Sequence, residues 1–545
     1  MTTGSSADPH ADGRADIRTD VLVLGNGPVG QTTALLLARW GVRVLLLDAR
    51  PVRDVIGSKA ICQQRDVLDV WSACGVDRIA PEGVTWSRAR TLYRDQELFC
   101  VELEDAGRSP LPPFVNISQA RTEQALDEAI AASPLIDVRW DHEVTAIEQD
   151  DGGVVVRGRT ADGDMLLQAR YAVACGGARG TALRTALGVG FAGRTFDDAF
   201  LICDIRADLP GWKAERRFYF DPSWNPGRQV LIHPCPDSVF RIDWQVEPGF
   251  DLESARADGS LDRRIRAVVG NQDYEIVWSS VYRFQARCVD QMRVGRVLLA
   301  GDLAHLVAPF GARGLNSGVG DAENAAWKLA FVLRGWGGAD LLPSYDAERR
   351  AAAQENLDVT SATMDFLVPQ TPEAREHRSR VLAAAATGDV AARAAVDSGR
   401  LAEPFWYIDS ALTTACSDRP WPGRPERGRP PSSVPGVVLL DGPARDPDDP
   451  SVTRLRELCR GGLLVLVGTS SDVSACREAL SHVLVPGTPV RVLALDEVDV
   501  ANVLRTALRA RDDEIWLVRP DAHLAACLRT PADLANAAVR ALALV

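Results

Sequence analysis

Positions 20–24 form a short, mostly apolar run that ends at Gly25. Apolar residues with helical spacing follow over 31–40 until Gly41, and a second apolar run covers 42–47. A short continuous apolar run predicts a buried strand, whereas apolar residues three and four positions apart predict a helix, which a glycine commonly ends. The chain therefore begins with a strand, a turn, a helix and a second strand. That order predicts the first half of a doubly wound parallel sheet.

The middle of the chain shows a different pattern. Weaker strand signals begin near residue 91, and 216–246 alternates apolar and polar residues, is rich in aromatic residues and is interrupted by Pro-Gly turn signals. Alternation with a period of two predicts half-buried strands, so we expect an antiparallel sheet in a second domain. An apolar strand returns at 297–300, followed by a Gly-rich turn and a helical pattern over 318–335.

The last quarter of the chain predicts a third domain. Residues 420–435 are too dense in Pro, Gly and Arg to pack regularly, which indicates a linker. Beyond it, four apolar runs are separated by helix-forming stretches. We expect these runs to be strands, at 436–440, 462–467, 490–495 and 515–518.

Composition narrows the class of protein. The 545 residues exceed a typical domain of about 100 to 200 residues, and 46% of them are apolar, as in a globular protein. Asp and Glu outnumber Lys and Arg by 74 to 61, a net charge of −13 that opposes general binding to nucleic acid or to an anionic membrane. No apolar run approaches the roughly 20 residues of a membrane-spanning helix. We therefore expect no nucleic-acid partner and no membrane span.

The N-terminal residues and the cysteines indicate where in the cell the protein is located. The first residues lack the apolar core of a secretion signal, and 1–18 are expected to form a mobile tail. The eleven cysteines include no CxxC pair and no metal-binding spacing. We expect reduced thiols in the cytoplasm and no metal site.

The first motif with chemistry is Gly25-Asn26-Gly27-Pro28-Val29-Gly30, between the first strand and the first helix. Glycines permit a tight turn there and let backbone N–H groups approach a pyrophosphate at the positive end of the helix. Asp48 ends the second strand, where a carboxylate can accept hydrogen bonds from an adenosine ribose. The pattern indicates an adenine dinucleotide, and it does not separate FAD from NAD(P).

A second motif lies far downstream, in the segment GRVLLAGDLAHLVAPFGARGLNSGVGDAENAAWKLA over 295–330. Asp302 follows a strand and can hold polyol hydroxyls, and the turn over 311–318 leads into a helix whose N-terminus can face a flat, electron-accepting ring. The ordered elements GD, AH, P, GxN and DAxNxxWKLA resemble the second FAD fingerprint of the class A flavoprotein aromatic hydroxylases, the family with the p-hydroxybenzoate hydroxylase fold.

The resemblance implies roles for individual residues. It places Asp302 on the ribityl chain, Pro309 beside the reactive edge of the flavin, and the backbone of 314–316 on its pyrimidine side. It also places Lys59 near the FAD phosphates and Gln119 against FAD from the start of a helix. The complete expected cofactor set is Gly25, Gly27, Pro28, Gly30, Asp48, Ala49, Arg50, Lys59, Gln119, Asp302, Pro309, Gly314, Leu315 and Asn316.

One short motif departs from the family pattern. The family carries Asp-Gly followed by Ser and Arg, proposed to serve both FAD and NAD(P)H, whereas here Gly176 stands at the acidic position and the Ser is missing. Arg179 and Arg184 in this stretch are candidates either for ligands or for ordinary surface charges. The departure leaves the handling of the nicotinamide open.

The resemblance extends to the architecture. The end of the chain looks like the thioredoxin-like appendage of the phenol-hydroxylase branch, and 398–414 resembles 3-(3-hydroxyphenyl)propionate hydroxylase-like members. The expected fold class is α/β and α+β, a doubly wound FAD-binding domain interleaved with an antiparallel-sheet substrate domain. The expected boundaries are 19–90, 119–190 and 291–415 for the FAD-binding domain, 91–118 and 191–290 for the substrate domain, 416–436 for the linker, and 437–545 for a thioredoxin-like domain without CxxC.

The resemblance implies an NAD(P)H-dependent monooxygenase that takes FAD as cofactor. NAD(P)H reduces FAD, O2 adds at flavin C4a, and one oxygen passes to an electron-rich carbon of a phenolic or polyketide-like substrate. Baeyer-Villiger oxidation or epoxidation on the same fold is one alternative, and a catalytically silent FAD-binding scaffold is another. A second copy of the chain is a candidate partner, as a homodimer.

The aromatic-rich sheet segment supplies the candidate substrate residues. His233 can accept a phenolic proton and Arg241 can bind a carboxylate or a carbonyl, so these two and Pro309 are the catalytic candidates. Each sheet residue, taken singly, can also be an ordinary core or rim residue. The candidates for contact with the substrate are Tyr219, Trp224, His233, Arg241, Asp243 and Trp244.

Overall fold

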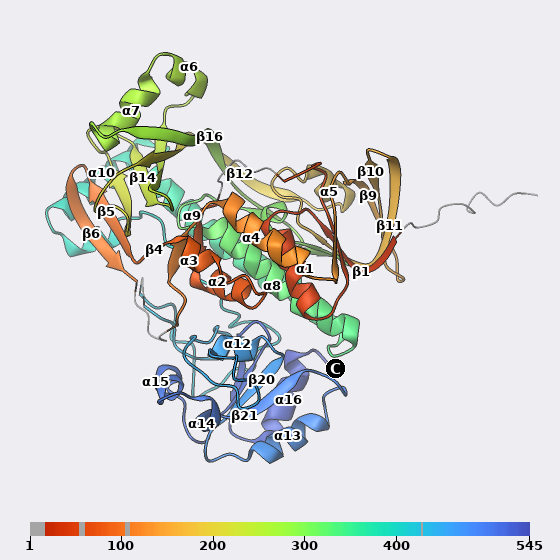
Figure 1. Ribbon diagram of the computed structural model, residues 1–545. Coiled ribbons are helices and arrows are strands. Elements are labelled where there is room, and N and C mark those ends of the chain that lie inside the picture. Colours follow the sequence, from red (N-terminus) through yellow and green to blue (C-terminus); the bar gives the residue numbers. More distant parts are fainter. Residues whose placement is uncertain (1–16, 54–59, 104–108, 427–428, 545) are drawn as a thin grey trace, which may run out of the picture.

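The structure is a computed structural model that describes residues 17–53, 60–103, 109–426 and 429–544. Figure 1 shows two sheet-containing bodies that share one long central helix, α8 (Arg313–Arg334), and a C-terminal body that packs below it. In the described part of the chain, no helix is both long and apolar enough to cross a membrane.

The first body is built on a mostly parallel sheet. Its order is β17-β18-β11-β1-β2-β8, and β1 (Ile17–Leu24) runs parallel to both neighbours, with Leu24 opposite Leu47 and Ala174. Its central strands are continuous Val and Leu because both faces of a parallel sheet are covered. The other strands are β2 (Val44–Leu47), β8 (Ile136–Arg139), β11 (Gly163–Ala174), β17 (Arg293–Val294) and β18 (Val297–Leu299), with β9 (Glu143–Gln149) and β10 (Val154–Thr160) joined to β11.

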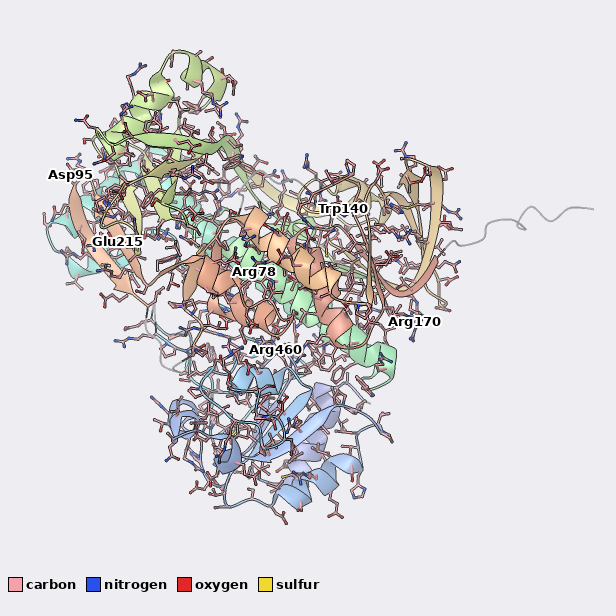
Figure 2. All side chains as sticks on the ribbon, in the orientation of Figure 1. Arg78, Asp95, Trp140, Arg170, Glu215 and Arg460 are labelled. Carbon is pink, nitrogen blue, oxygen red and sulfur yellow. The ribbon has the colours of Figure 1, made fainter. Side chains whose placement is uncertain are left out.

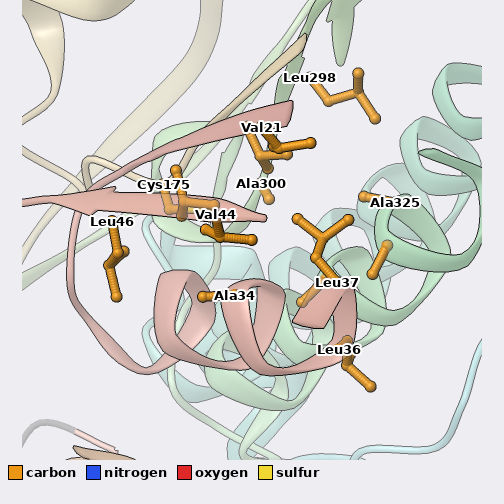
Figure 3. Packing of buried hydrophobic residues seen from close by; sticks show 14 of the residues in the cluster. Val21, Ala34, Leu36, Leu37, Val44, Leu46, Cys175, Leu298, Ala300 and Ala325 are labelled. Carbon is orange, nitrogen blue, oxygen red and sulfur yellow. The ribbon is translucent and has the colours of Figure 1, made fainter. Parts of the chain in front are cut away.

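Helices cover this sheet and form its core. Figure 3 shows Ala34, Leu36 and Leu37 of α1 (Pro28–Arg39) below the strands and Ala325 of α8 beside them. Burying such side chains stabilises the fold by about 25 cal/mol per Å² of apolar area. The expected first helix and strands are confirmed within a few residues. The remaining helices of this body are α4 (Gln119–Ala131) and α5 (Thr181–Ala186).

A small sheet lies between the two bodies. Its order is β3-β7-β4, from β3 (Cys62–Gln64), β7 (Phe114–Asn116) and β4 (Val84–Trp86). The helices α2 (Arg65–Ser72) and α3 (Ile79–Glu82) lie between β3 and β4 in the chain. β7 lies within 91–118, which we assigned to the substrate domain, whereas its paired strands in the described part of the chain, β3 and β4, come from 62–86. A three-residue strand carries too little pattern to show its partner from the sequence.

The second body is an eight-stranded, mixed sheet with the order β19-β16-β12-β15-β14-β13-β5-β6. Antiparallel pairing dominates, as expected, although β13 runs parallel to β5. Helices α6 (Leu252–Ala257) and α7 (Ser260–Val269) cover its outer face. The strands are β5 (Arg88–Tyr93), β6 (Gln96–Glu102), β12 (Phe191–Ala207), β13 (Glu215–Phe220), β14 (Gln229–Pro234), β15 (Val239–Val246), β16 (Tyr274–Val289) and β19 (His305–Leu306).

Helices that follow α8 in the chain pack against the inner face of this second sheet. α9 (Pro343–Leu367) and α10 (Pro372–Ala386) share an apolar cluster with Phe310 and the strand residues Phe200 and Phe218. Short elements complete this region: α11 (Val390–Ala395) and the 3-10 turns η1 (Gly301–Leu303) and η2 (Ala339–Leu341).

The C-terminal body has a four-stranded sheet with the order β21-β20-β22-β23, parallel only between β20 and β21. The stretch 436–440 is not a strand, although it forms an isolated bridge, Val438 with His523, and backbone hydrogen bonds with 522–524. The other three expected strands are present. The elements are α12 (Leu455–Cys459), β20 (Leu463–Val467), α13 (Val473–Ser481), β21 (Val490–Ala494), α14 (Leu495–Val498), α15 (Val503–Leu508), β22 (Ile515–Val518), β23 (Leu524–Leu528) and α16 (Pro531–Ala541).

Candidate cofactor and substrate site

The first glycine turn contains two kinds of glycine. Gly25 has φ +118°, and a Cβ there would lie 2.4 Å from the Cys175 carbonyl oxygen; a Cβ at Gly30 would lie 1.9 Å from the Gly25 oxygen. Both positions therefore need glycine for the strand, turn and helix to pack. A Cβ at Gly27 would meet nothing within 4 Å. Gly27 thus leaves open space before α1, whose N-terminus has no side-chain cap, and this fits a pyrophosphate.

The end of β2 carries a fixed carboxylate. Asp48 accepts hydrogen bonds from the backbone N–H groups of Asn26 and Arg50, each 2.9 Å long, and forms an ion pair with the Arg50 guanidinium at 2.9 Å. Burial acts to raise the pKa of Asp48, but the hydrogen bonds from Arg50 and Asn26 hold the pKa below its ordinary value. Asp48 is therefore an ionised acceptor at the position expected for a ribose partner.

A basic residue that the sequence analysis missed lies beside the glycine turn. Arg53 donates to the backbone oxygen and to Oδ1 of Asn26, each at 3.0 Å, and forms ion pairs with Glu123 and Asp127. Lys59, to which we gave the phosphate role, lies outside the described residues. Arg53 precedes Lys59 by six positions, so the only available signal was a second cation in the same loop.

The N-terminus of α8 forms the second part of the site. Gly311 has φ +100°, and a Cβ there would lie 2.0 Å from the Arg400 oxygen. The N-cap Ala312 adopts a left-handed conformation and offers no side-chain cap, so the first N–H groups of α8 point outward without one. The helix begins at Arg313, five residues before our expected start, which places Gly314 and Leu315 in its first turn.

Asn316 has a second role besides its expected backbone contact. Its side-chain oxygen accepts the Gln64 N–H at 3.0 Å, and its side-chain nitrogen donates to the Cys62 oxygen at 3.0 Å. The amide therefore fixes β3 against the start of α8. Gln119 acts similarly, because its Oε1 accepts the Ala60 N–H at 3.2 Å and its Nε2 donates to Glu123 at 2.9 Å.

The two glycine-bearing segments meet in space. A Cβ at Gly301 would lie 3.0 Å from Val29, and a Cβ at Gly318 would lie 2.7 Å from Val29 and 3.2 Å from the Gly301 Cα. Val29 belongs to the first turn, whereas Gly301 immediately precedes Asp302. Asp302 and Pro309 are both exposed. The open cradle at Gly27, the carboxylate of Asp48 and the uncapped α8 therefore fit one FAD molecule.

Polar residues of the α8 motif hold the neighbouring loops. Asp321, fully buried, accepts the Gly301 N–H at 2.9 Å, contacts His305 Nε2 at 2.7 Å and pairs with Arg349 at 2.7 Å. Burial acts to raise the pKa of Asp321, yet His305 and Arg349 keep the pKa below its ordinary value. The motif therefore supports the site through the loop that carries Asp302.

The loop that departs from the family pattern is closely packed. A Cβ at Gly176 would lie 2.7 Å from the Leu183 side chain, and a Cβ at Gly180 would lie 2.4 Å from the Leu303 side chain. Arg184 is neither a surface charge nor an exposed ligand. It is buried, donates to the Leu303 oxygen at 3.1 Å and lies over the Phe191 ring. This loop therefore supports η1 from beneath.

The substrate candidates divide between the two faces of the second sheet. Trp244 pairs with Val230 and packs with Tyr219 and Trp224 in the outer cluster under α6 and α7. These three aromatic residues therefore lie in another cluster than Phe310, and their contact with the substrate stays a prediction. His233, Arg241 and Asp243 lie on the inner face.

The inner face carries an unusual polar cluster. Arg241 is engaged by Asp204 in a bidentate pair, with hydrogen bonds of 2.7 and 2.9 Å. Among the described residues, Asp243 Oδ1 and His233 Nδ1 are buried and have no hydrogen-bond partner. The His233 ring lies edge-on to Trp86, with centroids 6.4 Å apart, and Trp86 shares an apolar cluster with Ala312 at the start of α8. The cluster therefore adjoins the second part of the cofactor site.

Comparison with known proteins identifies the class that this fold and site define. Residues 18–360 match the family of the FAD binding domain, and the chain belongs to that family. It is 25% identical to aklavinone-11 hydroxylase, solved in a ternary complex with FAD and aklavinone, with a TM-score of 0.76 and coverage of 96% of this chain and 99% of that one. The flavin-dependent monooxygenase PieE has the same fold, with a TM-score of 0.83, 22% identity and coverage of 97% and 100%.

A sequence relative carries a more specific name. The chain is 32% identical over 372 residues to the 3-(3-hydroxy-phenyl)propionate/3-hydroxycinnamic acid hydroxylase of Comamonas testosteroni. The similar region covers 67% of this chain and 61% of that relative's length. The expected FAD-binding family and the expected fold, that of the solved flavin-dependent monooxygenases, are confirmed.

Proposed function

We propose that this protein is an NAD(P)H-dependent flavin monooxygenase that hydroxylates a phenolic, aromatic substrate. The observation that carries the proposal is the meeting of Val29 from the first glycine turn with Gly301 and Gly318 from the second segment, which builds one cofactor site from two distant parts of the chain. The names of the hydroxylases that resemble this chain support a phenolic or polyketide-like substrate.

The chain's own residues have defined tasks in this proposal. Gly27 and the start of α1 accommodate the pyrophosphate, Asp48 holds the ribose, Asp302 holds the ribityl chain, and the first turn of α8 faces the pyrimidine side of the ring. FAD, when bound, supplies the redox and oxygen chemistry. The apolar part of the inner face, with Phe200, Phe218 and Phe310, excludes water from the reacting groups.

The test begins with the purified protein and its visible spectrum. We expect bound FAD, and consumption of NAD(P)H and O2 that is stimulated by a phenol. A screen would include 3-(3-hydroxyphenyl)propionate, 3-hydroxycinnamate and aklavinone, with products identified by NMR, which separates ring hydroxylation from Baeyer-Villiger oxidation or epoxidation. Bound FAD without stimulation by any phenol would favour the scaffold alternative, whose motivation is that Gly176 stands where the family has Asp. Cytoplasmic location and a homodimer stay predictions from the sequence.

A further inference from the structure

The inner face of the second sheet contains buried polar atoms that have no partner in the described part of the chain. Oδ1 of Asp243 and Nδ1 of His233 are two of them, and Nε2 of Gln229, at the start of β14, is a third. A buried polar atom without a hydrogen bond costs about 1–3 kcal/mol, so folded proteins rarely keep one without a use. Two such atoms on one face, beside a cofactor site, indicate that a polar ligand atom belongs between them.

The strand register places both side chains on the same face. His233 of β14 is opposite Arg241 of β15, and Asp243 is opposite Leu231 of β14. Directly opposed residues of an antiparallel pair share a face, and so do residues two positions apart on one strand. Asp243 and His233 are therefore diagonal neighbours. Phe218 is opposite Leu231 in turn, and its ring centroid lies 6.2 Å from that of Phe310, the residue after Pro309.

Among the charged groups around His233 and Asp243, Asp243 is an acid without a cation as its ion-pair partner in the described chain. The Arg241 charge is taken up by the bidentate contact with Asp204, and Asp243 has no ion pair of its own in the described chain. Burial raises the pKa of Asp243 to about 7, with Asp204 acting in the same direction and Arg241 and Arg216 opposing it. Burial, with Arg216 and Arg241, holds the pKa of His233 well below its ordinary value, so the ring is neutral at physiological pH.

We propose that Asp243 is the base that takes the phenolic proton from the substrate and that His233 is a positioning residue for the same oxygen. This proposal rests on the proposed function. The phenolic O–H bond breaks, the proton forms an O–H bond with the Asp243 carboxylate, and the electron pair stays on the phenolic oxygen. The ortho and para ring carbons become richer in electrons and attack oxygen donors faster.

Binding without turnover tests the proposal first. Two probes are titrated into the FAD-loaded protein without NAD(P)H, and the change in flavin absorbance is followed: 4-methylphenol, which stays neutral from pH 5.5 to 8.5, and 2,3,5,6-tetrafluorophenol, which is ionised over most of that range. Above the Asp243 pKa, the neutral phenol should bind about tenfold more tightly, because a carboxylate accepts its proton better than a carboxylic acid does. The ionised phenol should bind more weakly, because two anions then meet.

Matched variants separate Asp243 from its surroundings. Asp243→Asn keeps the shape and removes the charge, so both pH dependences should disappear while FAD content and melting temperature stay the same. Asp237→Asn makes the same change at an exposed position in the turn of the same hairpin, where φ of 60° suits Asn, and it should behave as the wild type. His233→Gln should keep the pH dependence and weaken the binding of both probes.

Turnover provides the second readout. General base catalysis contributes about 10²- to 10⁴-fold, so Asp243→Asn should lose at least about a hundredfold in the hydroxylation of a neutral phenol. It should lose far less with an ionised fluorophenol, which needs no base. If Asp243→Asn keeps the wild-type pH dependence of binding and normal turnover, the role of Asp243 is wrong although the hydroxylase function stands. If no phenol is hydroxylated by the wild type, the proposed function fails as well.

Discussion

The glycines of the first turn differ in whether they leave space for a side chain. A substitution at Gly27 therefore tests FAD binding more directly than one at Gly25. A side chain at Gly25 meets the backbone at Cys175, whereas a side chain at Gly27 enters open space before α1. Gly27→Val should therefore fold with an unchanged melting temperature of the apoprotein and lose FAD affinity by tenfold or more, which corresponds to about 1.4 kcal/mol. Flavin stoichiometry and calorimetry of the apoprotein measure the two effects.

The control lies at a comparable open glycine. It is Gly461, beside α12 in the C-terminal body, where a Cβ would have only the Leu458 oxygen within 4 Å, at 3.4 Å. Gly461→Ala should leave FAD binding unchanged. Full FAD retention by Gly27→Val would contradict the position of the pyrophosphate.

Some residues of the candidate site could be predicted from the sequence, and others could not. Gly25, Gly27, Gly30 and Asp48 could be predicted because a strand, a turn and a helix follow one another within thirty residues. Arg53 could not, because its contact with Asn26 depends on how the loop after β2 folds back over the turn. The buried role of Arg184 was hidden for the same reason, since its partner Leu303 lies 119 positions away.

At the scale of elements, the alternating pattern predicted the second sheet but not its faces. Period-two alternation assigns the residues of one strand to its two faces. The register between strands decides which residues of neighbouring strands lie on the same face of the sheet. His233 is opposite Arg241 and Val230 is opposite Trp244, so His233 and Trp244 lie on opposite faces. Shifting the pairing by one residue would bring them together, and the register depends on both the turn between β14 and β15 and the burial of each face. The substrate set could therefore not be divided correctly in advance.

One buried carboxylate of helix α8, Asp321, fixes the loop that precedes Asp302. Asp321 compensates the Arg349 charge and fixes the Gly301 N–H and His305. Asp321→Asn leaves Arg349 buried beside a neutral amide, and breaking such a pair costs about 3–5 kcal/mol in the free energy of unfolding. Urea unfolding should show this loss, and FAD affinity should fall because the loop before Asp302 is released.

A surface carboxylate on a neighbouring helix controls for the loss of charge. Asp358 is exposed on α9 and contacts only Gln354 among the described residues. Asp358→Asn should change the free energy of unfolding by no more than about 0.5 kcal/mol. An equally small effect of Asp321→Asn would show that the buried contacts do not organise the loop.

At the scale of the whole molecule, the C-terminal body is docked by buried charges and not by a flexible linker alone. Arg460, at the boundary in Figure 2, pairs with Asp69 of α2 and with Glu323 of α8. Residues 420–426 and 429–435 contain no helix or strand, as expected of a linker, yet Val434 is buried. A sequence read strand by strand cannot show such docking, because each ion pair joins residues from different domains.

A second buried cluster joins the C-terminal body to α9. Glu348, almost fully buried, accepts the Arg519 guanidinium through both oxygens, at 2.6 and 2.9 Å, and Lys328 Nζ at 2.7 Å. Trp327 of α8 donates to Asp521, the partner of Arg519, at 3.1 Å. Burial acts to raise the pKa of Glu348, but Arg519 and Lys328 hold the pKa far below its ordinary value.

Arg519→Met should therefore destabilise the whole flavoprotein, including the distant cofactor site. The variant leaves Glu348 with one cation, Lys328, among the described residues, beside the neutral donors Asn324 and Ser410. The expected loss is about 3–5 kcal/mol in the free energy of unfolding at pH 7. A lowered folded-state pKa stabilises the protein fully above the ordinary value of 4.5, and this stabilisation declines as the pH falls from 4.5 through the folded-state pKa, which lies far lower. The difference between wild type and variant should thus begin to shrink at pH 4. Urea unfolding at both pH values measures this difference in the free energy of unfolding. Arg540→Met, at an exposed position of α16, is the control. An equal difference at pH 7 and pH 4 would exclude the charge of Glu348 as the cause of the destabilisation.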